Sequence, residues 1–261
     1  IRKKELEKNK VLAELKNNAA EVYFLAWTTT PWTLPSNTAL AVGKEIDYTL
    51  VAFNHPISNE FQFCILADEL FSKYFDENPA LPKDVQADEY NSLKSAEEKL
   101  NFLKSKGVIL GAGKKAIGFK YSEKIKGKEL AGIHYDQLLP FAEPEGNAFK
   151  VLVGDFVTTT DGTGIVHIAP SFGADDFKVA KQNNVGSLTL VDKRGKFLPE
   201  VSDGIFLYGG EFVKEAYLNE EEKQIEFEKQ KKILESNGKI KELKVYLSVD
   251  ERIVLKLQEE G

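Results

Sequence analysis

The fold of this chain is organised around Gly162-Thr-Gly-Ile-Val-His-Ile-Ala-Pro-Ser-Phe-Gly-Ala-Asp-Asp-Phe177. The apolar residues before Pro170 predict a short strand. Because successive side chains of a strand point to opposite faces, His167 shares one face with Ile165 and Ala169. The strand therefore places one imidazole on an otherwise apolar wall. A histidine in this setting is more often an ordinary core or edge residue than a functional one, so both interpretations stay open at this point.

Two adjacent carboxylates follow the strand. Pro170 and Gly173 break the extended segment, and Asp175-Asp176-Phe-Lys-Val-Ala180 then predicts a helix. The first turn of a helix exposes backbone N–H groups that favour negative charge, so both acids could simply be partners of the helix dipole. In the functional interpretation, a carboxylate and the imidazole of His167 meet at the edge of one cleft.

A second informative stretch is Trp27-Thr-Thr-Thr-Pro-Trp-Thr-Leu-Pro-Ser-Asn37. It follows Val22–Trp27, whose β-branched and aromatic residues predict a buried strand. Pro31 and Pro35 keep the segment out of a β-ladder. Threonine hydroxyls and one amide then line an irregular loop, which suits the wall of a small-ligand site. Threonines in a row can also reflect strand propensity alone.

Composition and charge exclude several classes of protein. The chain has 261 residues, of which 42% are hydrophobic, so it can bury a sizeable core. Its single cysteine, Cys64, lies in an apolar run and excludes a disulfide framework. No apolar run is long enough to predict a membrane span, and no signal peptide is recognisable, so we expect a soluble, cytoplasmic protein. The formal net charge of -6 means that any contact with nucleic acid must be local.

Many short strands are predicted, and they favour a mixed α and β fold with a barrel or strongly bent sheet and peripheral helices. The main predicted strands are Val22–Trp27, Thr38–Val42, Tyr48–Phe53, Phe61–Leu66, Leu130–Leu139 and Phe149–Thr159. Asp161-Gly162 predicts a two-residue hairpin that pairs the histidine strand with Phe149–Thr159. Ser187–Asp192 and Gly195–Phe197 suggest a further β unit.

Helical patterns surround these strands. The predicted helices are Asp68–Phe75, an amphipathic helix with Leu93, Ala96, Leu100 and Leu103 at helical spacing, a Glu- and Lys-rich helix from Asn219, and a last helix capped at Ser248. We therefore expect a charged lead-in over residues 1–20, a domain over residues 21–217 with a helical insertion at 78–107, and a helical tail or linker over residues 218–261. The absence of methionine indicates a piece of a longer polypeptide.

Common catalytic motifs are absent from the sequence. Gly111-Ala-Gly-Lys-Lys-Ala116 has glycines spaced as in dinucleotide-binding loops, but β-forming residues and further glycines follow it where a crossover helix would be needed. There is no Gly-x-Ser-x-Gly elbow, no His-Glu-x-x-His and no phosphate-binding loop. With three histidines and one cysteine in the chain, no metal site is predicted.

The stretches at 27–37 and 161–176 together resemble the editing domain of isoleucyl-tRNA synthetase. Valyl and leucyl enzymes usually carry Thr-Thr-Arg-Pro in the first motif, whereas this chain has Thr-Thr-Pro at 29–31, which favours the isoleucine enzyme of a bacterium. The resemblance extends from about Val22 to about Tyr217 and implies the β-barrel-like editing domain of the Val/Ile/Leu-tRNA synthetases. The His-x-Gly-His and Lys-Met-Ser-Lys-Ser signatures of the synthetic site are absent, so ATP-dependent activation is not expected here.

The resemblance implies post-transfer editing, in which Val-tRNA(Ile) is hydrolysed and Ile-tRNA(Ile) is excluded. One methylene contributes only about 1–3 kcal/mol of discrimination, and this enzyme is itself the usual example of that limit. By the same resemblance, Asp176 holds the α-ammonium of the misacylated residue and His167 limits the amino acid accepted. The implied site residues are Thr28, Thr29, Thr30 and Asp176 for catalysis, and Trp32, Thr33, Asn37 and His167 for substrate binding. Water, and no protein nucleophile, is the implied attacking group.

The implied partners are the 3′ acceptor end of tRNA(Ile) carrying valine and the remainder of the synthetase, with no membrane. No cofactor is expected in this fragment, whereas the full-length enzyme would use ATP and Mg²⁺. Two other functions stay open. The chain could be a tRNA acceptor-end docking module that needs the full synthetase for hydrolysis, or an unrelated hydrolase that uses His167, Asp176 and Ser171.

Overall fold

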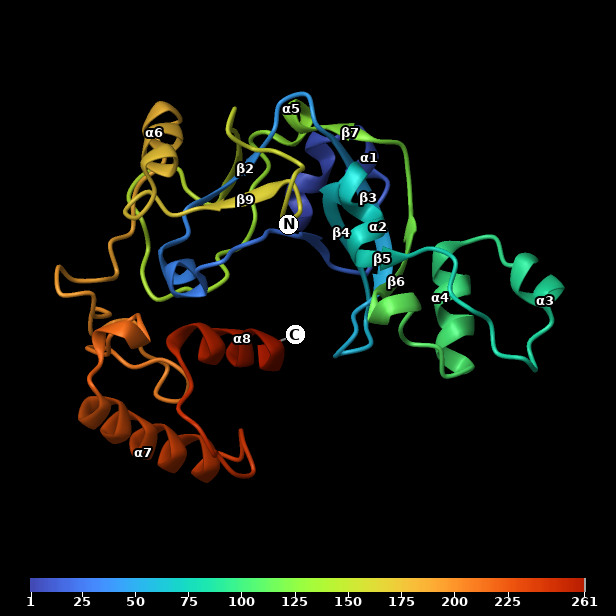
Figure 1. Cartoon of the computed structure of the whole chain (residues 1–261). Coiled ribbons are helices and arrows are strands. Elements are labelled where there is room, and N and C mark those ends of the chain that lie inside the picture. Colours follow the sequence, from blue (N-terminus) through green and yellow to red (C-terminus); the bar gives the residue numbers. More distant parts are fainter. Residues whose placement is uncertain (261) are drawn as a thin grey trace. The chain divides into compact units, whose positions relative to one another are not determined.

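A computed structural model describes residues 1–260 (Figure 1). These residues form two compact units, each assembled from segments that are far apart in the sequence. Unit 1 comprises residues 1–27, 39–136 and 149–167, and unit 2 comprises residues 28–38, 137–148 and 168 onward. Every described helix is too short or too polar to cross a membrane. The domain boundaries expected from the sequence stay a prediction.

The predicted mixed α and β class is confirmed. The strands are β1 (Val22–Phe24), β2 (Ala39–Val42), β3 (Asp47–Asn54), β4 (Phe61–Ala67), β5 (Phe75–Asp76), β6 (Ala116–Lys120), β7 (Ile125–Lys126), β8 (Lys150–Val153) and β9 (Ile165–Ile168). They form a six-stranded sheet in the order β1-β4-β3-β6-β5, with β7 paired to β3, and a three-stranded sheet in the order β8-β2-β9. No closed barrel is found within residues 1–260, so the barrel-like arrangement is not confirmed.

Strand β3 lies inside the larger sheet because its sequence is apolar on both faces. Leu50 and Ala52 face the main core of unit 1, whereas Val51 and Phe53 face a second apolar cluster. A continuous apolar run is typical of a strand buried on both sides. Strand β4 pairs antiparallel with β3 and places Cys64 opposite Val51. Cys64 is buried as predicted, and burial raises the pKa of its thiol far above the ordinary value.

The helices of unit 1 are short. They are η1 (Lys3–Lys8), α1 (Lys10–Ala13), η3 (Asp68–Leu70), α2 (Phe71–Tyr74), α3 (Ala87–Asn91), α4 (Ala96–Ser105), η4 (Ala112–Lys114) and α5 (Gly127–Leu130). The predicted amphipathic helix in the insertion is confirmed from Ala96 as α4, which begins with a capping box and buries Leu100 and Leu103, whereas Leu93 precedes the helix. Residues 1–20, expected as a charged lead-in, bury Leu6, Leu12 and Leu15 in the main core of unit 1.

Two expectations from the sequence are wrong. The hairpin at Asp161-Gly162 does not form, since β9 pairs with β2 and β8 lies at the other edge of β2. The reason is that β8 ends at Val153, so residues 154–164 form a long connection in which the turn is not flanked by paired strands. The strand expected at Leu130–Leu139 is also absent. Helix α5 occupies its start, and Gly132 at a φ of +82° interrupts an extended course.

Unit 2 is built from helices and irregular segments around an apolar cluster. Its helices are η2 (Pro31–Ser36), α6 (Ala174–Gln182), η5 (Glu215–Tyr217), α7 (Glu220–Ser236) and α8 (Val249–Glu260). The predictions of α6, α7 and α8 are confirmed, and Ser248 and Glu251 form the reciprocal bonds of a capping box at the start of α8. In place of the β unit expected near 187–197, the structure has isolated bridges, between Val191 and Phe197 and between Lys196 and Phe212.

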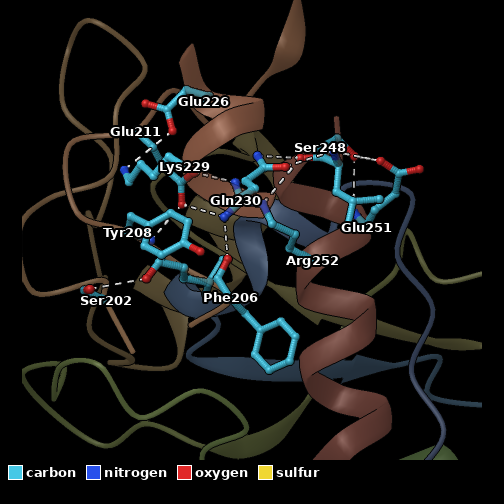
Figure 2. Close-up of polar contacts among 12 residues, drawn as sticks. Ser202, Phe206, Tyr208, Glu211, Glu226, Lys229, Gln230, Ser248, Glu251 and Arg252 are labelled. Atoms are coloured by element: carbon cyan, nitrogen blue, oxygen red, sulfur yellow. Dashed lines mark hydrogen bonds and ion pairs between the residues drawn. The ribbon is translucent and has the colours of Figure 1, made fainter. Parts of the chain in front are cut away.

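A buried ion pair anchors α8 within unit 2 (Figure 2). Arg252 of α8 is fully buried and donates to both carboxylate oxygens of Glu211 and to the carbonyl of Phe206. Gln230 of α7 donates to the Leu247 carbonyl at 3.0 Å, and the Leu247 amide donates back to its side chain. Burial raises the pKa of Glu211, while Arg252 beside it opposes that rise. Removal of one partner would leave a buried charge alone, so this cluster fixes α8 strongly.

Candidate functional site

The segment Thr28–Asn37, called the Thr-rich loop below, folds through its own hydroxyls. The Thr28 hydroxyl oxygen accepts a hydrogen bond from the Thr30 amide at 3.1 Å, and the Thr33 hydroxyl donates to the Thr30 carbonyl at 2.9 Å. Pro31 begins η2, where its fixed φ suits a helical start. Thr33 is buried, whereas Thr29 and Thr30 are exposed. Thr28 and Thr33 therefore shape the loop, while Thr29 and Thr30 present hydroxyls to solvent.

The end of the loop is held by two hydrogen bonds to one backbone carbonyl in unit 2. The Asn37 side-chain amide donates to the Ile168 carbonyl at 3.4 Å, and the Thr38 amide donates to the same carbonyl at 2.9 Å. Asn37 and Thr38 are both buried. Asn37, predicted as a substrate-binding residue, thus also has a structural contact that fixes the loop.

Trp32 connects the Thr-rich loop to the turn before α6. Its ring packs edge-to-face on Phe172, with centroids 5.0 Å apart, and the Lys214 ammonium lies 5.3 Å from its centroid. The Trp32 amide donates to the Asp250 carboxylate at 2.7 Å. Phe172 belongs to the turn that leads into Asp176, so the loop and that turn are neighbours in unit 2.

Asp176 lies in the first turn of α6 with its carboxylate held in place. Its Oδ2 accepts a hydrogen bond from the Ala169 amide at 2.9 Å. Gly173, the N-cap, lies so close that a Cβ there would be 2.7 Å from the Asp176 Cγ. Burial raises the pKa of Asp176, as does the charge of Asp175, while the Ala169 amide opposes the rise. The side chain is only partly buried, so a fixed carboxylate can meet a cationic ligand.

His167 belongs to β9 and therefore to unit 1. Only 9% of the residue is exposed, and burial lowers the pKa of its imidazole to about 4. The ring is therefore neutral at pH 7 and offers bulk and polarity without charge. All the other predicted site residues lie in unit 2.

The hydroxyl of Ser171 is hydrogen-bonded within unit 2. It donates to the Leu188 carbonyl at 2.9 Å and lies 2.7 Å from the Thr189 hydroxyl. These contacts give Ser171 a role in holding the turn before α6, and neither contact is to a base that could activate a nucleophile. Within residues 1–260, no group of three or more His, Cys, Asp or Glu side chains is placed to hold a metal ion.

Among the residues next to predicted site residues, Gly173 and Asp250 have roles that the sequence does not indicate. Gly173 breaks the strand and also leaves room for the Asp176 carboxylate. Asp250 belongs to the predicted tail and also binds the Trp32 amide. An acid within a capping box, such as Asp250, does not by itself indicate a functional role. No pattern in the sequence connects Asp250 with Trp32, which lies 218 residues away.

Comparison with known proteins adds an independent finding. No family model matches the chain. The isoleucine–tRNA ligase of Cytophaga hutchinsonii is 47% identical over 251 residues, which cover 92% of this chain and 19% of that ligase. The isoleucine–tRNA ligase of Bacteroides fragilis is 42% identical over 217 residues, covering 75% of this chain and 17% of that ligase. The chain belongs to the isoleucine–tRNA ligase family and spans about a fifth of the length of the relatives it matches.

Solved structures give a weaker likeness. The editing domain of the cytosolic leucyl-tRNA synthetase of P. falciparum is 16% identical, with 100% of this chain and 83% of that chain covered and a TM-score of 0.42. The corresponding domain of P. knowlesi is 19% identical, with 69% of this chain and 60% of that chain covered and a TM-score of 0.40. These scores are too low to establish a common fold.

Proposed function

We propose that this chain is the post-transfer editing domain of an isoleucine–tRNA ligase. It hydrolyses the ester of Val-tRNA(Ile) and excludes Ile-tRNA(Ile), and its partners are the valine-carrying 3′ end of tRNA(Ile) and the rest of the ligase. The proposal is supported by the sequence identity to isoleucine–tRNA ligases and by the contact between Trp32 and Phe172, which brings the Thr-rich loop to the turn that leads into Asp176.

In this proposal Asp176 binds the α-ammonium of the misacylated residue. The single observation that carries this role is the hydrogen bond from the Ala169 amide, which fixes one carboxylate oxygen while the side chain stays partly exposed. A charge-assisted hydrogen bond from an ammonium to a preorganised carboxylate orients the ester without a rearrangement of the protein. The substrate is thereby held by its amino group, which valine and isoleucine share, so Asp176 anchors but does not discriminate.

The hydrolysis itself is assigned to water. A water molecule attacks the ester carbonyl carbon and the carbonyl oxygen gains the negative charge. The carbonyl then re-forms as the bond to the ribose oxygen breaks, and a proton from the water passes to that oxygen, which gives valine and free tRNA. The exposed hydroxyls of Thr29 and Thr30 are proposed to donate hydrogen bonds to the ester or the water, and Trp32, Thr33 and Asn37 to keep the loop in shape for the terminal adenosine. His167, neutral at pH 7, is proposed to limit the size of the amino acid. No cofactor is required by these steps.

Deacylation assays test the proposal. We expect the chain to release valine from Val-tRNA(Ile) and to leave Ile-tRNA(Ile) intact. Asp176→Ala should lower the rate about 100-fold or more, because the ammonium anchor is lost. Ser171→Ala is the matched control in the same turn and should retain most of the activity, whereas an unrelated serine hydrolase would lose it.

Two results would contradict the assignment. Unchanged hydrolysis of Val-tRNA(Ile) by Asp176→Ala would remove the ammonium-binding role. No hydrolysis by the unchanged chain, with a non-hydrolysable valyl-adenosine analogue still bound, would favour the alternative that the chain is an acceptor-end docking module that needs the whole ligase.

A further inference from the structure

The Thr-rich loop has a contact to α8 that the proposed chemistry does not use. Trp32 is in the first turn of η2, where backbone N–H groups have no acceptor inside the helix. Its amide donates instead to Oδ1 of Asp250 at 2.7 Å, and this bond spans 218 residues of sequence. A hydrogen bond to an ionised carboxylate is among the stronger kinds in proteins. An acceptor 218 residues away in the sequence thus satisfies a backbone donor at the start of η2.

The helix that carries Asp250 is itself held firmly. Two residues further on, Arg252 is fully buried and is bound by Glu211 and by the carbonyls of Phe206 and Leu247 (Figure 2). The capping box of Ser248 and Glu251 fixes the first turn of α8, which contains Asp250. Because both neighbours are anchored, the carboxylate of Asp250 is presented from a rigid element, which is what a precise site requires.

The position of Pro31 agrees with the same pairing. Pro31, directly before Trp32, lines one surface hollow together with Val254 and Leu255 of α8, and η2 and α8 are neighbours in unit 2. The exposed threonines Thr29 and Thr30 immediately precede Pro31 and Trp32, so the bond from the Trp32 amide to Asp250 lies next to them in the chain.

From these contacts we propose that Asp250 is a positioning residue for the Thr-rich loop, acting through the Trp32 amide. The inference rests on the proposed function, since the loop is taken to orient the ester and the water. It implies that the helical tail takes part in the site instead of only leading to the rest of the ligase. A simpler alternative is that Asp250 only complements the dipole of α8 as an acid in its first turn.

The chain offers a direct measurement because it contains two tryptophans, Trp27 and Trp32. Labelling with ¹⁵N-tryptophan gives two backbone amide signals, whose hydrogen–deuterium exchange is followed by NMR. The Trp27 amide, which donates to the Ile165 carbonyl in unit 1, serves as the internal control. The variants are Asp250→Ala, which removes the acceptor, and Asp250→Asn, which removes the charge but keeps an acceptor oxygen. Glu259→Ala changes another acid of α8, one that pairs with Lys239, and is the matched control.

We expect Asp250→Ala to speed exchange of the Trp32 amide about tenfold or more without changing the Trp27 amide. Asp250→Asn should recover most of the protection, and Glu259→Ala should behave like the unchanged chain. With Val-tRNA(Ile), kcat should fall about tenfold in Asp250→Ala while KM changes less, because the loop is misplaced but the ammonium anchor remains.

Several outcomes overturn the inference. Unchanged exchange of the Trp32 amide in Asp250→Ala would show that the bond does not hold the loop, and equal exchange in the Ala and Asn variants would favour the dipole alternative. Faster exchange with an unchanged kcat would remove the link to the reaction. If the unchanged chain does not hydrolyse Val-tRNA(Ile), the proposed function fails, while the exchange of the Trp32 amide still decides whether Asp250 holds the loop.

Discussion

Gly173→Ala tests whether the position of the Asp176 carboxylate matters. The φ of Gly173 is -115°, which any residue adopts, so the added methyl group causes no backbone strain. Its Cβ would lie 2.7 Å from the Asp176 Cγ, and ordinary contact begins at 3.4 Å, so the carboxylate must move by at least about 0.7 Å. That movement disturbs the bond from the Ala169 amide. Since a shift of about 1 Å in a positioning group can cost a factor of about 100, we expect deacylation to fall about tenfold to 100-fold.

The stability of the variant should change little by comparison. Alanine is a poorer N-cap than glycine, and we expect a loss of no more than about 1–2 kcal/mol in the free energy of unfolding, measured in urea. The assay is hydrolysis of Val-tRNA(Ile), together with binding of a non-hydrolysable valyl-adenosine analogue. In an Asp176→Ala background, Gly173→Ala should weaken analogue binding no further, because the clashing carboxylate is gone. Undiminished hydrolysis in Gly173→Ala, or an equal additional loss of binding in the double variant, would refute the reasoning.

The two remaining predictions concern buried titratable groups. Burial lowers the pKa of His167 to about 4, below its ordinary value of 6.5. The unfolded chain therefore binds the proton better than the folded chain does. The free energy of unfolding should fall by up to about 3 kcal/mol as the pH drops from about 6.5 to about 4. His167→Gln should flatten that part of the pH profile of urea unfolding, and a profile identical to that of the unchanged chain would argue against a buried neutral imidazole. His167→Ala should let Ile-tRNA(Ile) be hydrolysed. Arg252→Ala leaves Glu211 buried without its cation and should cost about 3–5 kcal/mol, whereas the paired change Arg252→Met with Glu211→Leu should cost less. Equal unfolding midpoints for Arg252→Ala and the unchanged chain would contradict the burial of this pair.

The elements that were predicted correctly carry local signals. The run Tyr48–Phe53 is apolar except at Thr49 and lies within β3, and α4 contains Ala96, Leu100 and Leu103 of the predicted helical spacing. The helix containing Asp176 was predicted from two acids after a Pro and Gly turn. In each case the information lies within about ten residues, where backbone preferences and side-chain periodicity act directly.

The wrong predictions have a common physical cause. Asp161-Gly162 has the composition of a hairpin turn, but a turn makes a hairpin only when the strands on both sides continue, and β8 ends early at Val153. The order of strands around β2 depends on contacts between distant segments, which composition does not encode. For the same reason no local pattern pointed to Asp250, whereas Thr29, Thr30 and Asp176, whose roles stay a prediction, lie in motifs that are continuous in the sequence.

The bond between Trp32 and Asp250 also sets an order of events during protein synthesis. Its two partners are separated by 218 residues, and a ribosome adding about 5–20 residues per second needs about 10–40 s to make that length of chain. Throughout this interval the nascent loop has no access to the carboxylate that seats it, nor to the arginine that anchors α8. Unit 1 can bury its sheet during this interval, since all of its residues precede Asp250 in the sequence. The Thr-rich loop, although made 218 residues before Asp250, therefore reaches its final conformation only after α8 has been made.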